Sequence, residues 1–282
     1  MVFLPDSQLE QWLQDDIQGG DLTTRALGIG SRRGKIVYQH RQGGCVSGID
    51  AARRVLLRLG LEIETAAEDG QLLEADDILL VAKGRADALH QGWKTAQNIL
   101  EWSCGVTDYM FRMMQILRRH NAEGKIACTR KTIPGTKLLA TQAVIAGGGI
   151  IHRLGTAESI LLFANHREFW RDREDWSGMI AALRRNAPEK TLVVEANTLQ
   201  DAERALQAAP DILQLDKFAI EAISPLQALA AQIAPSCRLA LAGGINLESI
   251  EAYARTGVSL LITSSPYYAP PADIKTQLIA QS

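Results

Sequence analysis

Residues 238–265, RLALAGGINLESIEAYARTGVSLLITSS, carry the pattern that decides the fold. Two short apolar runs, 238–244 and 259–265, flank a segment, 246–257, whose apolar residues recur at helical spacing. A strand, a helix and a second strand in this order form a right-handed βαβ unit with parallel strands. The stretch therefore predicts a parallel sheet covered by helices.

The same alternation extends back to Lys125. Its other apolar runs are KIACTR (125–130), ESILLF (158–163), TLVVEA (191–196) and DILQLD (211–216). Roughly six or seven such units are too few for a standard eight-stranded barrel but enough for a smaller, closed or nearly closed one. An open doubly wound sheet is the alternative, and the pattern alone does not separate the two.

The first hundred residues have a different order of strand-like and helical runs, typical of a small sheet that carries a helix. Strand-like runs occur at 34–41, 44–49, 61–66 and 78–89. Between them, 50–60 has helical periodicity, with Asp50 as the expected cap and Gly60 as the stop. Two further helical segments, 90–105 and 106–120, are expected as a pair.

Composition excludes several classes of protein. The 282 residues are 46% hydrophobic and 22% charged, which is typical of a globular chain. A formal net charge of -2 provides no global field that would attract nucleic acid or an anionic membrane. The first residues have no basic n-region, and no run approaches the roughly 20 apolar residues of a membrane span. We therefore expect a cytoplasmic protein whose four cysteines are buried, reduced thiols.

Polar residues cluster where the predicted barrel strands end. In parallel α/β architectures, ligands bind at the carboxyl ends of the strands, so these side chains should converge on one rim. The residues are Thr129, Arg130, Lys131, Glu195, Asp216, Lys217, Gly243, Gly244, Ser264 and Ser265.

The cationic residues of this rim favour an anionic ligand. Residues 126–157 contain no Asp or Glu, but they include Arg130, Lys131, Lys137, His152 and Arg153. Arginine binds carboxylate or phosphate with two hydrogen bonds and lysine adds a point charge, so a dianion or diphosphate fits this excess. A basic solvated surface is the alternative. We also expect Gly243, Gly244 and a helix start at Asn246 to offer backbone amides to a phosphate.

The acidic residues Glu195 and Asp216 favour a metal. A carboxylate at a buried strand end is costly unless it is paired or binds a metal. Magnesium is held by one or two carboxylates, completed by water and ligand phosphates. Salt bridges to the neighbouring cations are an equally good interpretation from residue types alone.

These segments together resemble the quinolinate phosphoribosyltransferase family (nicotinate-nucleotide pyrophosphorylase, carboxylating). The resemblance rests on TRKTIPGTKLLATQAVIAGGGIIHRLG (129–155) with KTAQNIL upstream and VVEANTL, LQLDKF and LAGGINLESIEAYARTGV downstream. The early GGDLTT (19–24) is similar to the family's first motif. Within the family, the chain is most similar to the branch called ModD, a pyrophosphorylase associated with molybdenum transport.

The resemblance implies an N-terminal α/β sandwich domain, 1–108, to which 268–282 returns, and an incomplete α/β barrel of six or seven strands over 109–267. It implies a homodimer or dimer-based hexamer with shared active sites. It also implies transfer of phosphoribose from phosphoribosyl diphosphate to quinolinate in NAD biosynthesis, with release of diphosphate and decarboxylation to nicotinate mononucleotide.

By position in the family's motifs, the resemblance assigns roles to individual residues. Arg130, Lys131, His152 and Arg153 would line the acceptor and diphosphate site. Glu195 and Asp216 would hold the magnesium-diphosphate donor and stabilise the cationic sugar. The last loops, at Gly243, Gly244, Ser264 and Ser265, would bind the 5'-phosphate. Lys94 falls where the family has an arginine that reaches the neighbouring subunit's site.

The chain departs from the family pattern mainly on the acceptor side. Cys128 replaces an acid, Phe163 and Ala164 replace a lysine and an aspartate, and Lys217 replaces an asparagine. Ala242 stands where the family has serine, and Tyr267 and Tyr268 where it has threonine and histidine. We expect the phosphoribosyl-donor side to be retained, and a heteroaromatic acid with fewer carboxylates than quinolinate to bind beside Phe163.

Three alternatives remain at this point. The chain can be a true quinolinate phosphoribosyltransferase, which quinolinate turnover would reveal. It can be a non-catalytic protein that binds an anion or a nucleotide, as the replacements at Phe163 and Ala164 would allow. A Schiff-base aldolase using Lys131 is the third, since barrels support that chemistry too.

Overall fold

The structure, a computed structural model, describes residues 2–281. Its chain forms two compact units. The first comprises the residues up to 111, 132–148 and those from 266 onwards, and the second comprises 112–131 and 149–265. The mixed α/β class that the sequence predicts is confirmed, with an antiparallel sheet in the first unit and a parallel sheet in the second.

The sheet of the first unit has the order β13-β1-β5-β3 and antiparallel pairing throughout. Its strands are β1 (Arg33–His40), β3 (Glu62–Ala66), β5 (Ile78–Arg85) and β13 (Ile274–Ala280), and a separate short pair joins β2 (Gly44–Cys45) to β4 (Leu72–Leu73). Side chains alternate across β1, with Ile36 and Tyr38 fully buried and their neighbours more exposed. This alternation is what a strand with one covered face requires.

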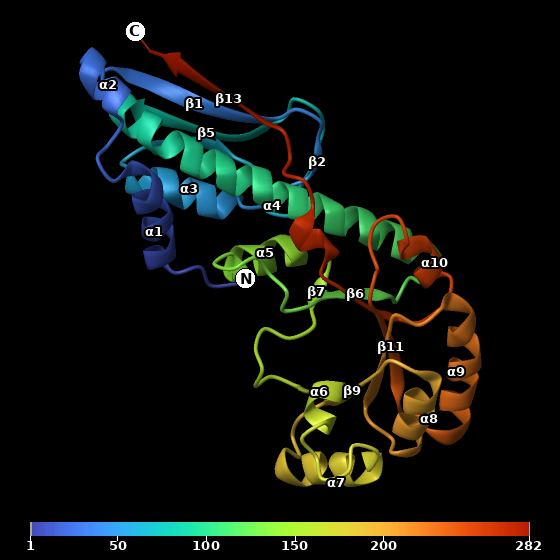
Figure 1. Cartoon of the computed structure of the whole chain (residues 1–282). Helices are drawn as coiled ribbons and strands as arrows, with labels where there is room; N and C mark the ends of the chain where they lie inside the picture. The colour runs from blue at the N-terminus through green and yellow to red at the C-terminus, as the bar shows by residue number, and fades with distance from the viewer. Residues whose placement is uncertain (1, 282) are drawn as a thin grey trace. The chain divides into compact units, whose positions relative to one another are not determined.

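Five helices belong wholly or partly to the first unit: α1 (Asp6–Ile17), α2 (Leu22–Leu27), α3 (Ile49–Arg58), α4 (Ala86–His120) and α5 (Lys137–Ala146). Helices α3 and α4 lie along one face of the β13-β1-β5 sheet (Figure 1). The core between them includes Tyr38, Leu56, Leu79 and Leu100, none of which is exposed. Burial of these side chains, at about 25 cal/mol per Å² of apolar surface, is the main source of stability in this unit.

The prediction of two helices over 90–120 is wrong, because one helix, α4, spans the whole segment. Gly105 marked the expected break, yet it lies in the interior of the helix. A Cβ at this position would lie 2.2 Å from the carbonyl oxygen of Pro270, so the glycine admits the C-terminal chain. The strand expected at 78–89 also ends early, at Arg85, where α4 takes over.

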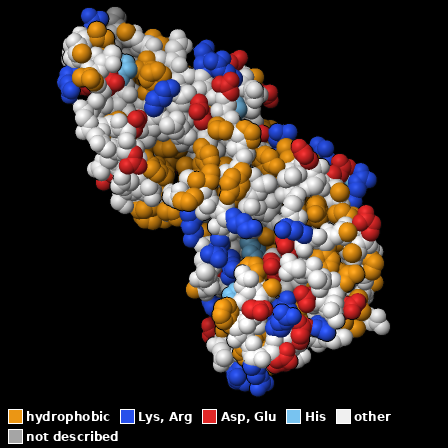
Figure 2. Space-filling model, viewed as in Figure 1, with side chains coloured by type: hydrophobic (Ala, Val, Ile, Leu, Met, Phe, Trp, Pro, Cys, Tyr) orange, Lys and Arg blue, Asp and Glu red, His pale blue; other side chains and the backbone are white. Residues whose placement is uncertain are grey.

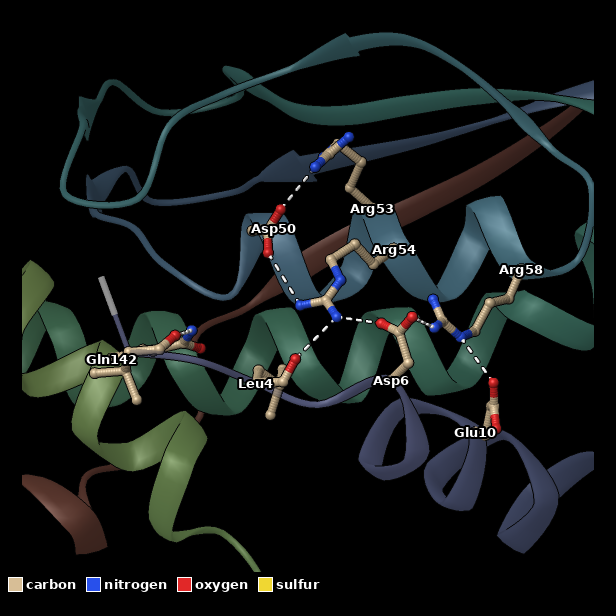
Figure 3. Close-up of polar contacts among 9 residues, drawn as sticks. Leu4, Asp6, Glu10, Asp50, Arg53, Arg54, Arg58 and Gln142 are labelled. Atoms are coloured by element: carbon tan, nitrogen blue, oxygen red, sulfur yellow. Dashed lines mark hydrogen bonds and ion pairs between the residues drawn. The ribbon is translucent and has the colours of Figure 1, made fainter.

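Asp50 is not the cap of α3, as the sequence suggested. The cap position is Gly48, and Asp69 Oδ1 accepts the Ile49 amide at 2.9 Å. Asp50 lies in the first turn instead, where it pairs with Arg53 at 2.7 Å (Figure 3). A carboxylate there is still favourable, because it faces the positive end of the helix dipole.

Ion pairs join α1 to α3 (Figure 3). Asp6 accepts hydrogen bonds from both Arg54 and Arg58, and Arg54 also donates to the Leu4 carbonyl oxygen at 2.9 Å. These two arginines hold the pKa of Asp6 below its usual range. The pairs fix the start of α1 against the exposed edge of α3.

The second unit contains seven strands in the order β7-β6-β12-β11-β10-β9-β8, and every pairing is parallel. Their bounds are β6 (Lys125–Cys128), β7 (Ile150–Ile151), β8 (Ile160–Leu162), β9 (Leu192–Ala196), β10 (Ile212–Asp216), β11 (Arg238–Ala242) and β12 (Leu260–Thr263). The consecutive strands β7 and β8 stand at the two ends of this order. The sheet is therefore the incomplete barrel that the sequence predicts.

Helices follow the strands of the second unit: α6 (Ala164–Arg167), α7 (Trp176–Asn186), α8 (Leu199–Gln207), α9 (Ile220–Ile233) and α10 (Ile250–Ala254), with the 3-10 turn η1 (Ser265–Tyr268) after β12. Figure 1 shows α8 and α9 running beside the strands. Buried side chains on the strands form a second core that includes Ala127, Val193, Ile212 and Ala240.

All four cysteines, Cys45, Cys104, Cys128 and Cys237, are buried and free, as predicted. Within residues 2–281, none of the helices combines the length and apolar character that a membrane span needs. Acidic and basic side chains are interspersed on the face seen in Figure 2, in keeping with the near-zero net charge.

Candidate active site

A cavity of about 420 Å³ opens at the carboxyl ends of the second unit's strands. It is lined by the ends of β6, β9, β10, β11 and β12 and by the segments after β7 and β8. All the residues that the sequence predicted for this rim contribute to it. They are Thr129, Arg130, Lys131, His152, Arg153, Phe163, Glu195, Asp216, Lys217, Gly243, Gly244, Ser264 and Ser265.

Three cations come from two neighbouring strand ends. Arg130 and Lys131 follow β6, and Arg153 follows β7, which pairs with β6. Arg153 is 8% exposed, and burial together with the nearby Arg130 lowers the pKa of its guanidinium. Burying one cation close to another is costly, so the arrangement favours a ligand that brings negative charge.

His152 does not add to this positive charge, contrary to the expectation from sequence. Burial, reinforced by the adjacent Arg153, lowers the pKa of the imidazole, so the ring is neutral at neutral pH. Its backbone N–H donates to the Cys128 carbonyl oxygen at 2.9 Å, which continues the β6–β7 ladder. The neutral ring offers one hydrogen-bond donor and one acceptor to the cavity.

Phe163 places an aromatic face beside the cations. Its ring stacks on His166 with 5.7 Å between ring centroids and an interplanar angle of 19°. The Phe163 N–H donates to His166 Nδ1 at 3.1 Å, which fixes the imidazole in this position. The Arg153 guanidinium lies 5.8 Å from the centroid of the Phe163 ring. This geometry allows a cation–π contact, and it directs Arg153 towards the ring.

The carboxylates come from the central strands. Glu195 is on β9 and Asp216 ends β10. Burial and the negative charge of Asp216 raise the pKa of Glu195, against a hydrogen bond from Gln214 and the charges of Lys131 and Lys217. Asp216 Oδ2 accepts a hydrogen bond from Asn197 Nδ2 at 3.3 Å. Two carboxylates that repel one another form a site whose energy a cation would lower.

These groups fit magnesium better than they fit zinc. No cluster of three or more His, Cys, Asp and Glu that could hold a metal exists in the described chain. Glu195 and Asp216 supply carboxylate oxygens only, and the buried Gln214 Oε1 has no hydrogen-bond partner among the described residues. Hard oxygen donors in small number, completed by water and ligand phosphates, are the magnesium pattern.

Gly243 and Gly244 bring the backbone close to β10. Both have positive φ angles, 87° and 78°. A Cβ at Gly243 would lie 2.4 Å from Lys217 Cγ and 2.8 Å from Asp216 Oδ1, so only glycine fits there. The next residues do not start a helix as expected. Asn246 Oδ1 accepts the amides of Glu248 and Ser249, each at 3.0 Å, and α10 begins only at Ile250.

Lys94 lies outside this cavity. It is on α4 in the first unit, where its Nζ donates to Gln97 Oε1 at 3.1 Å and lies 4.5 Å from the centroid of the Trp93 ring. Its predicted role in a neighbouring subunit's site stays a prediction.

Sequence reasoning missed Gln214 and Thr263, which also line the cavity. For Gln214 the signal was present, since it is the one polar residue inside the apolar run of β10 and lies two positions before Asp216. A strand period of two places both on the same face. Thr263 gave no such signal. Its Oγ1 donates a hydrogen bond to the Ile245 carbonyl oxygen at 2.6 Å, a contact between the end of β12 and the loop after β11.

Comparison with known proteins gives a consistent result. Residues 21–104 match the model of the quinolinate phosphoribosyl transferase N-terminal domain, and residues 106–277 match that of its C-terminal domain. A protein named ModD from Escherichia coli O6:H1 is 56% identical over 278 residues, covering 99% of this chain and 98% of its own length.

More distant relatives are similar along most of the chain. The nicotinate-nucleotide pyrophosphorylase [carboxylating] of Mycobacterium leprae is 30% identical over 257 residues, covering 88% of each chain. The solved structure of NadC from Streptococcus pyogenes superposes with a TM-score of 0.89 at 24% identity, covering 100% of both chains. At this identity the structural match shows the fold alone.

Proposed function

We propose that this chain, which belongs to the quinolinate phosphoribosyltransferase family, transfers phosphoribose from phosphoribosyl diphosphate to a small anionic heteroaromatic acid. The observation that carries the proposal is the single cavity in which Arg130, Lys131 and Arg153 meet Glu195 and Asp216. Reaction of phosphoribosyl diphosphate needs both the cations and the carboxylates, because its leaving group is anionic and its sugar becomes cationic during the reaction.

The cations act on the leaving group in this proposal. As the bond from the ribosyl carbon to diphosphate breaks, its electron pair leaves with the diphosphate oxygen. Arg130 can form two parallel hydrogen bonds to phosphate oxygens, and Lys131 adds a point charge. Arg153 is held at the edge of the same cavity, 8% exposed. Donors fixed before the reaction stabilise the developing charge without having to reorganise.

Glu195 acts on the sugar. An oxocarbenium-like centre forms as diphosphate departs, and a carboxylate nearby stabilises it. Gln214 and Lys131 favour the ionised form of Glu195, against the effect of its burial. Magnesium, when bound by Glu195 and Asp216, would supply charge neutralisation to the diphosphate group.

The acceptor side distinguishes this chain from the family pattern. Phe163 and Ala164 stand where the family has a lysine and an aspartate. The loss of the lysine at position 163 removes a full positive charge from the acceptor pocket. The stacked pair of Phe163 and His166 offers a flat surface to a ring, and Arg153 beside it offers one cationic group. We infer a heteroaromatic acid with fewer carboxylates than quinolinate.

The oligomer is part of the proposal. Lys94 is outside its own chain's cavity, and by position in the family motif it would reach the cavity of a second copy. A homodimer, or a hexamer built from dimers, would therefore complete each site. Analytical ultracentrifugation together with mixed-subunit complementation between Lys94→Ala and Arg130→Ala tests this, because a shared site restores activity in part of the mixed dimers.

The deciding experiment is an assay of diphosphate release from phosphoribosyl diphosphate, with and without magnesium. It is run against quinolinate, nicotinate and further heteroaromatic acids. We expect release with an acceptor other than quinolinate. A kcat/KM of about 10⁴ M⁻¹s⁻¹ or more with quinolinate, the lower range of ordinary enzymes, would show a conventional acceptor site instead. Binding of phosphoribosyl diphosphate without release against the whole panel would indicate a non-catalytic binding protein.

A further inference from the structure

Lys217 has a backbone conformation that is unusual for its type. Its φ angle is 60°, in the left-handed region, which among the described non-glycine residues is shared only with Asp76 and Ala209. A residue with a long side chain pays roughly 1 to 2 kcal/mol there, whereas glycine and asparagine adopt it readily. Such strain at a strand end persists when the surrounding structure requires it.

The neighbouring chain is shaped around this residue. The Lys217 N–H donates to the Ala242 carbonyl oxygen at 2.8 Å, which extends the β10–β11 ladder by one bond. Gly243 then lies so close that a Cβ would meet Lys217 Cγ at 2.4 Å. The lysine side chain therefore passes over a glycine that has no room for a side chain of its own.

The charge of Lys217 is available to a ligand. The residue follows Asp216 directly and lines the cavity. Its positive charge favours the ionised form of Glu195, as does that of Lys131. Among the ion pairs found within residues 2–281, none involves Lys217. A strained backbone that delivers an ammonium group to the region of Glu195 and Asp216 is difficult to explain by stability alone.

We propose that Lys217 supplies part of the positive charge that a divalent cation otherwise provides, so that this site binds diphosphate groups in the absence of metal. The inference rests on the proposed function, because it takes the diphosphate of phosphoribosyl diphosphate as the ligand. It goes further in assigning to one residue a reduced dependence on magnesium.

The test is calorimetric titration with inorganic diphosphate, once in EDTA and once in excess magnesium, on the full chain. Three proteins are compared: wild type, Lys217→Asn and Lys217→Met. Methionine keeps the aliphatic length and the backbone strain but removes the charge. Asparagine removes both the charge and the backbone strain. The control is Ala209→Asn, at the exposed left-handed residue after α8, outside the cavity.

We expect wild type to bind diphosphate in EDTA, and both Lys217 variants to lose about tenfold or more in affinity there, which is about 1.4 kcal/mol. In magnesium the loss should be less than about threefold, because the metal takes over the charge. Lys217→Asn should also melt higher than wild type, since its backbone strain is relieved. Ala209→Asn should melt higher too, with unchanged diphosphate affinity.

The outcomes separate this inference from the proposed function. Wild type that binds diphosphate in magnesium but not in EDTA overturns the role of Lys217 and leaves the proposed function standing. Equal losses in both conditions overturn it as well, because they make Lys217 an ordinary contact. Failure to bind diphosphate in either condition would count against the proposed function itself.

Discussion

The side chains of Glu195 and Gln214 are joined by a hydrogen bond of 2.7 Å, from Gln214 Nε2 to Glu195 Oε2. The two residues are direct partners in the parallel β9–β10 pair. Gln214 is 4% exposed, so its amide has little freedom to turn away. The orientation of the cavity's central carboxylate is thus set by the neighbouring strand.

Replacing Glu195 by glutamine should stabilise the protein at neutral pH. Burial and Asp216 raise the pKa of Glu195 above its usual 4.5, so the folded state binds this proton more tightly than the unfolded state does. The stability that Glu195 contributes is full below the unfolded pKa and is lost as pH rises through the folded pKa. Glu195→Gln should therefore melt higher than wild type at pH 7, and the difference should disappear near pH 4.

The same variant should lose turnover by about 10²- to 10³-fold, the range for removal of one group that stabilises a transition state. Thermal melts at several pH values and the diphosphate-release assay check the two effects. A variant that is less stable than wild type at pH 7 would contradict the argument from burial.

Arg130→Lys should reduce kcat/KM for phosphoribosyl diphosphate, although the charge is kept. Lysine cannot form two parallel hydrogen bonds with one phosphate, and loss of a hydrogen bond to a charged group costs about 1.5 to 3 kcal/mol, or roughly 10- to 100-fold. Steady-state kinetics with varied donor measure this. Arg238→Lys, on the exposed start of β11 outside the cavity, is the matched control and should behave as wild type. Unchanged kinetics in Arg130→Lys would exclude a two-bond contact.

Phe163→Lys should move the acceptor preference towards quinolinate. The substitution returns a cation to the position where the family has one, beside Arg153. A charge-assisted hydrogen bond to a second carboxylate is worth about 1.5 to 3 kcal/mol, so quinolinate turnover should rise roughly tenfold or more. The ratio of kcat/KM for quinolinate and nicotinate is the measurement. A fall in both values by the same factor would indicate that Phe163 only supports packing.

Asp6→Asn should destabilise the first unit in a pH-dependent way. Hydrogen bonds from Arg54 and Arg58 lower the pKa of Asp6, so its contribution to stability is present above the unfolded pKa of about 3.9 and is lost as pH falls through the lower, folded value. Urea midpoints of variant and wild type should differ at pH 7 and converge at low pH. The difference should also shrink in high salt, because Asp6 is on the surface. Glu64→Gln, at an exposed position of β3, controls for the loss of one negative charge.

Much of the fold of the second unit can be predicted from the sequence, because the patterns that indicate its strands and helices are local. An apolar run such as 211–216 followed by the helical pattern of 220–233 predicts a βα unit, and parallel strands bring their ends together. The convergence of Arg130, Glu195 and Asp216 on one cavity follows from that rule alone. The family resemblance added roles to these residues, which geometry by itself does not provide.

The errors arose where distant contacts override local preference. Gly105 suggested a break, but α4 continues through it, and the close approach of Pro270, a residue far along the chain, is what requires a glycine there. Asp50 is of a residue type that often caps helices, but Asp69, in a loop, accepts the Ile49 amide at the start of α3. Asn246 was expected to start a helix, and its side chain does accept the amides of Glu248 and Ser249, but α10 begins only at Ile250. The neutral His152 depended on burial, which no local pattern reports.

The position of the break in the barrel has an evolutionary consequence. His152, Arg153 and Phe163 follow β7 and β8, the strands at the two ends of the sheet, whereas Glu195 and Asp216 are on strands paired on both sides. Insertions between β7 and β8, at residues 153–159, break no hydrogen-bond ladder, and changes at the ends of these two strands disturb one, while changes in β9 and β10 disturb two. Under the proposed function, changes of acceptor preference would therefore cost less stability than changes to the groups that act on the donor.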